Sequence, residues 1–325
     1  MIRFSIIIPV KEINAYVRET VPYILGLRNP DWELIIVPNA EAPSEWHDDR
    51  IRLMASCRVG PGVKRDLAAQ SARGNILVFL DDDSYPRADL LDVAVPYFED
   101  SGVVALGGPA VTSPQDGFWQ RVSGTVFLSK LCCGAPERYV PLGHAREVDD
   151  WPSVNLMVRK DDFLSIGGFD SSYWPGEDTK LCLDLVKKVG KKILYVPELM
   201  VWHHRRSGWL KHLKQVGGYG LHRGFFVKAH PETSRRPAYF VPAAFVLFVL
   251  LSMFARCMPR EIRMFIAAGW LAYGLALLKI LADFLRYETL AVSCCSLWYA
   301  FCTHLVYGAR FLQGLSTRAL RSTLR

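Results

Sequence analysis

The sequence lacks the short motifs that define several common classes of protein. Its 8 cysteines include no CxxC pair and no Cys/His ligand spacing, so neither a zinc module nor a redox motif is predicted, and we expect reduced structural thiols. No GxxxxGK[ST] loop is present, which argues against a P-loop nucleotidase. Charged residues make up only 22% of the chain and hydrophobic residues 50%, which argues against a disordered or coiled-coil protein.

The N-terminus shows no signal peptide. Residues 1–10 form a short apolar run, and the charged Lys11 and Glu12 follow it without a cleavage site. We therefore expect the N-terminal half to stay on the side of the membrane where it is made, which predicts a cytoplasmic domain. A length of 325 residues allows about two domains with an ample core.

Basic residues outnumber acidic residues by a small margin. The chain has 39 Lys and Arg against 32 Asp and Glu, a net charge of +7. The excess gathers at residues 187–192, at residues 203–236 and beside apolar stretches near the C-terminus. This distribution favours a diphosphate ligand and anionic lipids, and we predict no nucleic-acid partner.

Short apolar runs alternate with helical stretches in the first third of the chain. Strands are expected at residues 4–10, 33–37, 75–80 and 103–106, with helices at 15–27 and 64–72. Nearly continuous apolar strands separated by helices predict a mostly parallel sheet covered on both faces, an α/β architecture. Further on, a strand is expected at 154–158, a helix at 179–189 and a strand at 193–196.

Long apolar stretches fill residues 239–255, 264–285 and 290–315. Each is near the roughly 20 residues that a spanning helix needs. Lys279 and Asp283 stand four residues apart and are expected to neutralise each other on one helix face. A soluble domain with buried helices is the alternative, but little polar sequence remains to cover these stretches.

The orientation of these stretches conflicts with the usual charge rule. If the first half is cytosolic and every stretch spans, both arginine groups face outward, against the positive-inside tendency. The groups are Arg256, Arg260 and Arg263, and Arg318, Arg321 and Arg325. One stretch can instead be re-entrant or lie in the interface plane, so the number of spans stays open.

Consecutive acids follow the strand at residues 75–80, and they are Asp81, Asp82 and Asp83. Ligands of such sheets bind beyond the carboxyl ends of the strands. Adjacent carboxylates repel one another unless a cation offsets the charge, and Mg²⁺ or Mn²⁺ would take such oxygen ligands. A solvated acidic loop is the alternative. Upstream, Lys64 and Arg65 open a helix after a Gly-Pro-Gly turn, which suits a phosphate group.

Taken together and in order, these segments resemble the family-2 glycosyltransferases of the GT-A fold. The matching segments are SIIIPVKEIN, GPGVKRDLAAQSARGNILVFLDDD, VNLMVRKDDFLSIGGFD and WPGEDTKLCLDL. They lie within about residues 3–206. The resemblance implies a GT-A nucleotide-sugar-binding domain with a mostly parallel sheet, which transfers a sugar with inversion at the anomeric carbon.

The resemblance also assigns residues to the donor side. The residues that match donor-contact positions are Pro9, Glu12, Lys64, Arg65, Asp81 and Asp82. It implies that Asp83 ligates a divalent metal, Mg or Mn, and that Asp81 contacts the ribose or a metal-bound water. His203 is implied as a second ligand, with His204 as its alternative, and Arg206 would bind the diphosphate or, equally, lipid headgroups.

The acceptor side follows from a second acidic pair. Glu177 and Asp178 match the family's paired acids, and Asp178 would be the general base. Asn155, Glu177 and Trp174 are expected to line the acceptor side, where Trp174 would stack on a sugar ring. The alternatives are ordinary structural roles: acids favour the first turn of a helix, and tryptophan is commonly packed.

Departures from the family pattern limit the reading. The second strand ends in Val37-Pro38-Asn39 where the family has an acid that holds the base. Asn39 could still bond a base, so the donor stays open, with a UDP-sugar as first choice. The QxxRW signature of processive synthases is absent, which favours transfer of a single sugar.

The sequence as a whole predicts a membrane-attached glycosyltransferase. We expect a catalytic domain at residues 1–206, a basic interfacial segment at 207–237 and a membrane-associated helical region at 238–325. The expected partners are a nucleotide-sugar, a glycan or lipid-linked acceptor for surface polysaccharide, and membrane lipids at the cell membrane. A membrane-anchored binding scaffold with a degenerate site is the alternative, which Asn39 supports and Asp178 opposes.

Overall fold

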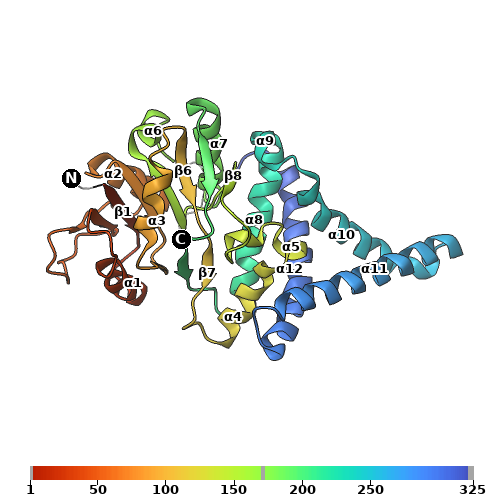
Figure 1. Cartoon of the computed structure of the whole chain (residues 1–325). Coiled ribbons are helices and arrows are strands. Elements are labelled where there is room, and N and C mark those ends of the chain that lie inside the picture. The colour runs from red at the N-terminus through yellow and green to blue at the C-terminus, as the bar shows by residue number, and fades with distance from the viewer. Residues whose placement is uncertain (1–2, 170–172, 321–325) are drawn as a thin grey trace. The chain divides into compact units, whose positions relative to one another are not determined.

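The chain folds as two compact units (Figure 1). The computed structural model describes residues 3–169 and 173–320, so Arg321 and Arg325 lie outside the described residues. The first unit contains the described residues up to Pro114 together with Glu137–His204, and the second contains Gln115–Pro136 and Arg205–Leu320. The place of Gln115–Pro136 in the second unit is a feature that the sequence does not predict. The domain boundaries expected at residues 206 and 237 stay predictions.

A mixed sheet of eight strands forms the centre of the first unit, in the order β3-β2-β1-β4-β9-β6-β10-β8. Parallel pairs join β1 to β2 and β4, β2 to β3, and β6 to β10. Two strands run the other way: β9 lies antiparallel between β4 and β6, and β8 lies antiparallel to β10. The strands are β1 (Phe4–Pro9), β2 (Trp32–Val37), β3 (Ile51–Leu53), β4 (Ile76–Leu80), β6 (Val103–Gly107), β8 (Arg146–Val148), β9 (Asn155–Arg159) and β10 (Lys192–Tyr195).

Helices cover both faces of this sheet. Ile6 and Ile8 of β1 pack into one core and Ile7 into the other, because neighbouring side chains of a strand point to opposite faces. The first core includes α1 (Ala15–Leu25) and α3 (Leu90–Tyr97). The second includes α2 (Pro61–Ser71), α6 (Lys160–Ser165) and α7 (Glu177–Asp184), and α7 continues as the π-helical turn η3 (Leu185–Val189). Burial on both faces explains the nearly continuous apolar runs.

A small second sheet has the order β5-β11-β7. It consists of β5 (Ser84–Pro86), β7 (Ala110–Thr112) and β11 (Val201–His203). β11 pairs antiparallel with β5, and this register sets His203 opposite Ser84. The end of β11 is thereby fixed beside the acids that follow β4.

The second unit is helical. Its segment Gln115–Pro136 forms α4 (Phe118–Thr125), the turn η1 (Val126–Leu128) and α5 (Lys130–Cys133), and the short turn η2 (Pro136–Arg138) follows. The later helices are α8 (Trp209–Ala229), α9 (Pro231–Ser234), α10 (Pro237–Met253), η4 (Ala255–Cys257), α11 (Arg260–Phe284) and α12 (Leu290–Ser316). By length and composition, α11 and α12 are candidate membrane spans, and α10 is a shorter apolar helix. Lys279 and Asp283 form the expected ion pair on α11.

Candidate active site

Potential metal ligands meet where β4 and β11 end. Asp81 and Asp83 follow β4, and His203 is the last residue of β11. One ligand atom of each residue lies within 4.8 Å of the others, and His203 Nε2 is 3.2 Å from Asp83 Oδ1. Carboxylate oxygens suit Mg²⁺ and Mn²⁺, and a set that adds one imidazole nitrogen favours Mn²⁺, because Mg²⁺ is bound mainly by oxygen. The residues present therefore fit a divalent ion.

The two adjacent histidines face different partners. His204 Nε2 is 3.0 Å from Glu19 Oε2, on α1. The backbone N–H of His204 donates to the Asp83 carbonyl at 2.9 Å, which joins the end of β11 to the acidic segment. Of the two histidines that the sequence leaves open, the structure thus brings His203 into the acidic cluster and His204 to Glu19.

The middle acid of the acidic segment is held by α1. Asn14 Nδ2 donates to Asp82 Oδ2 at 2.6 Å, while Asn14 Oδ1 accepts the Val17 N–H and caps the helix. Pro9 is buried at the end of β1, and Glu12 is exposed three residues later. Asp82 therefore fixes the segment to α1 while Asp81 and Asp83 face His203.

Lys64 binds the ends of two neighbouring strands. Its buried ammonium donates to the carbonyls of Val10 and Val37, at 2.5 and 3.1 Å, and to Asn39 Oδ1 at 2.7 Å. Burial lowers the pKa of Lys64, and the charge of Asp82 opposes this effect. Lys64 and Asn39, which are both predicted to contact the donor, are thus hydrogen-bonded to each other.

Arg65 connects the acidic segment to α7. Its guanidinium is almost fully buried, with Nη2 2.5 Å from Asp81 Oδ1 and Nη1 3.6 Å from Glu177 Oε1. The same guanidinium lies 5.4 Å from the centre of the Phe169 ring. Gly176 precedes α7 with a positive φ of 117°, which a glycine adopts without strain. That turn starts the helix at Glu177 and directs Glu177 toward Arg65.

Asp178 has a second carboxylate beside it. Asp178 Oδ1 accepts the Thr179 N–H at 2.8 Å, and its Oδ2 accepts the Ser153 N–H at 3.4 Å. The Thr179 hydroxyl donates to Asp150 Oδ1 at 3.2 Å. Arg138 completes the group: its Nη2 donates to the Asp150 carbonyl at 2.8 Å and lies 3.4 Å from Asp150 Oδ2.

Both acids of the α7 pair hold protons more tightly than usual. Burial raises the pKa of Asp178, and the negative charge of Asp150 raises it further. Burial, and next the charge of Asp178, raise the pKa of Glu177 to about 8, and Arg65 opposes this rise without cancelling it. A carboxylate with a raised pKa is a stronger base once it has ionised.

Other residues that the sequence singles out lie in different surroundings. The buried Asn155 amide donates to the Leu199 carbonyl at 2.6 Å, a contact that ties β9 to the segment before β11. Trp174 is half-buried in the segment that precedes α7. Arg206 is exposed and belongs to the second unit. The predicted donor and acceptor roles of these residues stay predictions.

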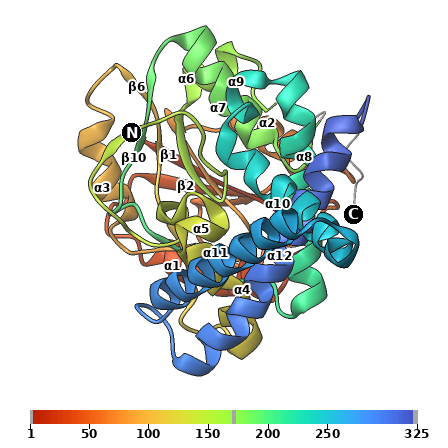
Figure 2. The ribbon, with the colours of Figure 1, turned by 90° about the vertical axis from the view of Figure 1, so that its right-hand side faces the viewer.

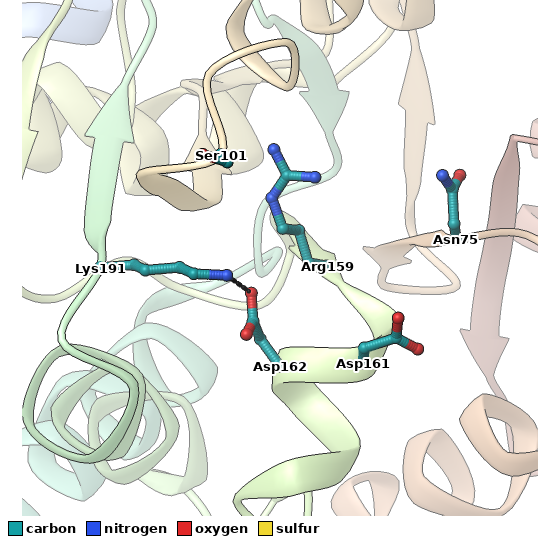
Figure 3. Close-up of a pocket in the computed structure, with 6 residues that line it drawn as sticks. All are labelled: Asn75, Ser101, Arg159, Asp161, Asp162 and Lys191. Atoms are coloured by element: carbon teal, nitrogen blue, oxygen red, sulfur yellow. Dashed lines mark hydrogen bonds and ion pairs between the residues drawn. The ribbon is translucent and has the colours of Figure 1, made fainter.

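A surface pocket lies at the opposite edge of the sheet, where β4, β6 and β10 begin (Figure 3). Its lining includes Arg159, whose guanidinium donates to the carbonyls of Phe98, Asp100 and Val103. Lys191 Nζ pairs with Asp162 there at 2.7 Å. These contacts hold loops at the amino ends of the strands, away from the acidic cluster.

Four residues of the site are not predicted from the sequence. They are Asn14, Glu19, Arg138 and Asp150, and each acts on a residue distant in sequence. The doublet Asp149-Asp150 directly before Trp151 is a visible signal for an acid near the site. Arg138 gives no signal, because an isolated arginine in an irregular segment is common.

Comparisons with known proteins agree with this geometry. Residues 3–217 match the model of the family described as glycosyltransferase like family 2. A pre-mycofactocin glycosyltransferase of Mycobacterium tuberculosis is 25% identical over 256 residues, which cover 77% of this chain and 52% of that protein. A glucosyl-dolichyl phosphate glucuronosyltransferase of Haloferax volcanii is 23% identical over 206 residues, covering 57% and 63%. The chain thus spans about half to two thirds of the length of these curated relatives.

The fold also has a solved counterpart. The mannosyltransferase PcManGT of Pyrobaculum calidifontis, in complex with GDP-Man and Mn²⁺, superposes with a TM-score of 0.59 and 17% identity. The match covers 97% of this chain and 87% of that one. A likeness at this identity establishes a shared fold, so the predicted GT-A fold with C-terminal apolar helices is confirmed.

Proposed function

We propose, since the chain belongs to glycosyltransferase like family 2, that it transfers a single sugar from a nucleotide-sugar to an acceptor hydroxyl with inversion at the anomeric carbon. The observation that carries this proposal is the connection of two acidic groups by one arginine. Arg65 contacts Asp81 of the acidic cluster and Glu177 beside Asp178. Groups suited to the leaving diphosphate and to the attacking hydroxyl are thereby held in one site.

Asp178 is the proposed general base. Its carboxylate would take the proton of the acceptor hydroxyl while that oxygen attacks the anomeric carbon, opposite the departing diphosphate. The bond from the anomeric carbon to the diphosphate oxygen breaks as the new glycosidic bond forms, so one displacement inverts the configuration. Asp150 supports this role, because its charge raises the pKa of Asp178.

The donor side is proposed to bind the diphosphate. Asp81, Asp83 and His203 would hold a Mn²⁺ or Mg²⁺ ion, which as a Lewis acid would stabilise the negative charge that develops on the diphosphate. Asn14 and Glu19 would keep the acidic segment and β11 in position through Asp82 and His204. The metal bound in the mannosyltransferase of the same fold supports this assignment.

The acceptor is proposed to be lipid-linked, at a membrane. The apolar helices α11 and α12 support membrane attachment, and one relative is named for action on a glucosyl-dolichyl phosphate. Attachment confines the enzyme to the surface that holds such an acceptor, which raises the rate of encounter. The first unit is proposed to be cytoplasmic and to lie at the cell membrane. A UDP-sugar is the proposed donor and is tested first.

The experiment is a donor panel with the full chain in detergent. UDP-, GDP- and dTDP-sugars with Mn²⁺ are scored by release of the nucleoside diphosphate and by thermal shift. Asp178→Asn is expected to keep the donor-induced thermal shift and to lose turnover by about 100-fold or more. The exposed Asp161 gives a matched control, because Asp161→Asn removes an acid at the other edge of the sheet.

Three outcomes would contradict parts of the proposal. Turnover by Asp178→Asn at the wild-type rate would exclude the base and favour a binding scaffold. Full activity in EDTA would exclude the metal role of the acidic cluster while leaving transfer itself intact. Donor binding without turnover in the wild-type chain, with every acceptor class tried, would also favour the scaffold.

A further inference from the structure

The longest helix of the second unit, α12, is packed tightly against a polar helix. A Cβ added at Gly220 of α8 would lie 2.5 Å from the Tyr307 carbonyl oxygen, and one at Gly224 would lie 2.1 Å from that of Phe311. His212 Nε2 is 2.8 Å from the Thr303 hydroxyl, and Lys228 Nζ donates to the Thr317 carbonyl at 2.7 Å. Contacts therefore run in parallel from one end of α8 to the other, along the C-terminal half of α12.

The helix α8 is too polar to lie inside a bilayer. It carries charged residues throughout its length: Lys211, Lys214, Arg223 and Lys228. Within residues 3–169 and 173–320, α11 and α12 are long and apolar enough to cross a membrane, and the apolar α10, with 17 residues, is at the lower limit of that length. Charged side chains at bilayer depth are strongly unfavourable, so the half of α12 that packs on α8 shares its position outside the hydrocarbon.

The N-terminal half of α12 is covered by α4. Arg121 of α4 forms an ion pair with Glu288, directly before α12. Ser296 Oγ donates to the Val122 carbonyl at 3.1 Å, and Val122 and Val126 pack in one core with Val292 and Tyr299. Polar or amphipathic helices thus accompany both halves of α12.

Exposed tryptophans lie beside the first third of α12. Trp298 is 58% exposed, and the half-exposed Trp209 of α8 stacks on it with ring centres 6.5 Å apart. Trp119 of α4 stacks at 6.4 Å on the neighbouring Tyr299. Trp298 lies about 12 Å along the helix axis from Leu290, so it would be inside the hydrocarbon of a bilayer about 30 Å thick that was centred on α12. Tryptophans prefer the membrane interface.

The helices α10 and α11 are exposed in a different way. In Figures 1 and 2, α11 and α12 run in clearly different directions, and α10 and α11 meet at η4. In the most apolar stretch of α11 only 11% is buried inside the protein, whereas 44% of the corresponding stretch of α12 is buried. The hairpin contacts α12 at its two ends, where Pro242 meets Gly308 and Phe284 packs with Val292. It also contacts α12 between them, where Tyr273 Oη is 2.9 Å from His304 Nδ1 and the rings of Phe245 and Phe301 are 6.2 Å apart. The part of the hairpin next to η4 exposes many apolar side chains, which include Leu247, Leu250, Met253, Phe254, Met264 and Phe265.

We propose that α12 lies in the plane of the membrane interface, together with α8 and α4, and that the α10–α11 hairpin is the part that crosses the bilayer. The partner of the α4–α8–α12 layer is an anionic lipid surface. Exposed tryptophans enter the headgroup region, and the exposed Lys211 and Lys214 of α8 face lipid phosphates. Arg318, after α12, then lies on the same side as α8, with most of the basic residues of the unit.

Cysteine labelling of the full chain in membrane vesicles tests this arrangement. The buried Cys182 and Cys302 are kept. The exposed and half-exposed cysteines are first replaced by serine, and these are Cys57, Cys132, Cys133, Cys257, Cys294 and Cys295. Three variants then carry one reporter cysteine each. The first restores Cys257 in η4, the second has Lys211→Cys in α8, and the third has Ser316→Cys at the end of α12. An impermeant maleimide is added to vesicles of both orientations, and the serine background is the control for unlabelled chain.

The expected result is that positions 211 and 316 are labelled from one side and position 257 from the other. Labelling of 211 and 316 from opposite sides would mean that α12 spans, and it would overturn the proposal. Labelling of 257 from the same side as 211 would show that the hairpin does not cross, and it would overturn the second half. Each variant must keep the thermal unfolding midpoint of the background within about 2 °C.

Discussion

The guanidinium of Arg65 joins Asp81 to Glu177. Nη2 lies 2.5 Å from Asp81 Oδ1, and Nη1 lies 3.6 Å from Glu177 Oε1. Arg65 is 2% exposed and Glu177 5% exposed, so their contact is formed away from water, whereas the Asp81 side chain is 38% exposed. A change in the position of Arg65 therefore affects the acidic segment after β4 and the start of α7 together.

Arg65→Lys is expected to lower kcat/KM for transfer by about 10- to 100-fold, which corresponds to about 1.4 to 2.7 kcal/mol of transition-state stabilisation. An ammonium is a single point of charge and cannot bridge both carboxylates as the planar guanidinium does. Arg73→Lys is the matched control, because the Arg73 side chain is 61% exposed and its ion pair with Glu33 is long, at 4.0 Å. An Arg65→Lys enzyme with wild-type kcat/KM would show that the bridge is not needed.

Asp83→Asn and His203→Ala are each expected to weaken Mn²⁺ binding by at least about 10-fold, because each removes one ligand of a small donor set. The measurement is titration calorimetry with Mn²⁺, which reports affinity without turnover. Asp161→Asn is expected to leave the affinity unchanged. Unchanged Mn²⁺ affinity in both ligand variants would contradict the assignment of the site.

The sequence allows prediction of the part of the site that follows from strand ends. Asp81 and Asp83 come directly after an apolar strand, and such ends carry the ligands of α/β sheets. The choice between His203 and His204 depends on the pairing of β11 with β5. The sequence does not encode that register locally, because alternate residues of a strand simply face opposite sides.

Long-range contacts account for what the sequence does not predict. The antiparallel direction of β9 depends on its insertion between β4 and β6, far apart in the chain. Gln115–Pro136 belongs to the second unit because Val122 and Val126 pack with residues of α11 and α12, more than 150 residues later. Arg138 and Asp150 join the site through tertiary contacts alone.

Asp150→Asn is expected to move the acidic limb of the pH–rate profile to lower pH, by roughly 0.5 to 1 unit. The charge of Asp150 raises the pKa of Asp178, whereas Arg138 opposes this effect. Asp178 acts only when ionised, so removal of the Asp150 charge makes the base form available at lower pH. The asparagine can still accept the Thr179 hydroxyl, which preserves the local geometry.

The neighbouring Asp149 provides the control for this profile. It is exposed, whereas Asp150 is buried, so Asp149→Asn changes the same net charge without changing the surroundings of Asp178. The profile of Asp149→Asn is expected to match that of the wild type. A shift of equal size in both variants would mean that net charge, and not the position of Asp150, sets the pKa of Asp178.

Asp66→Asn is expected to stabilise the protein at pH 8 but not at pH 4. Burial raises the pKa of Asp66 to about 7, although its carboxylate accepts the Phe169 N–H at 2.8 Å. A folded-state pKa above the unfolded value means that folding favours the protonated carboxyl group. The protonated Asp66 therefore contributes its full stability below the unfolded pKa, and this contribution is lost as the pH rises through about 7. Asparagine keeps the acceptor oxygen and cannot ionise.

After solvent screening, the gain in the free energy of unfolding from Asp66→Asn at pH 8 is expected to be about 1 to 3 kcal/mol. Thermal unfolding of both proteins at the two pH values measures it, with the exposed Asp92→Asn as control. An equal midpoint difference at pH 4 and pH 8 would contradict ionisation of Asp66 as the cause.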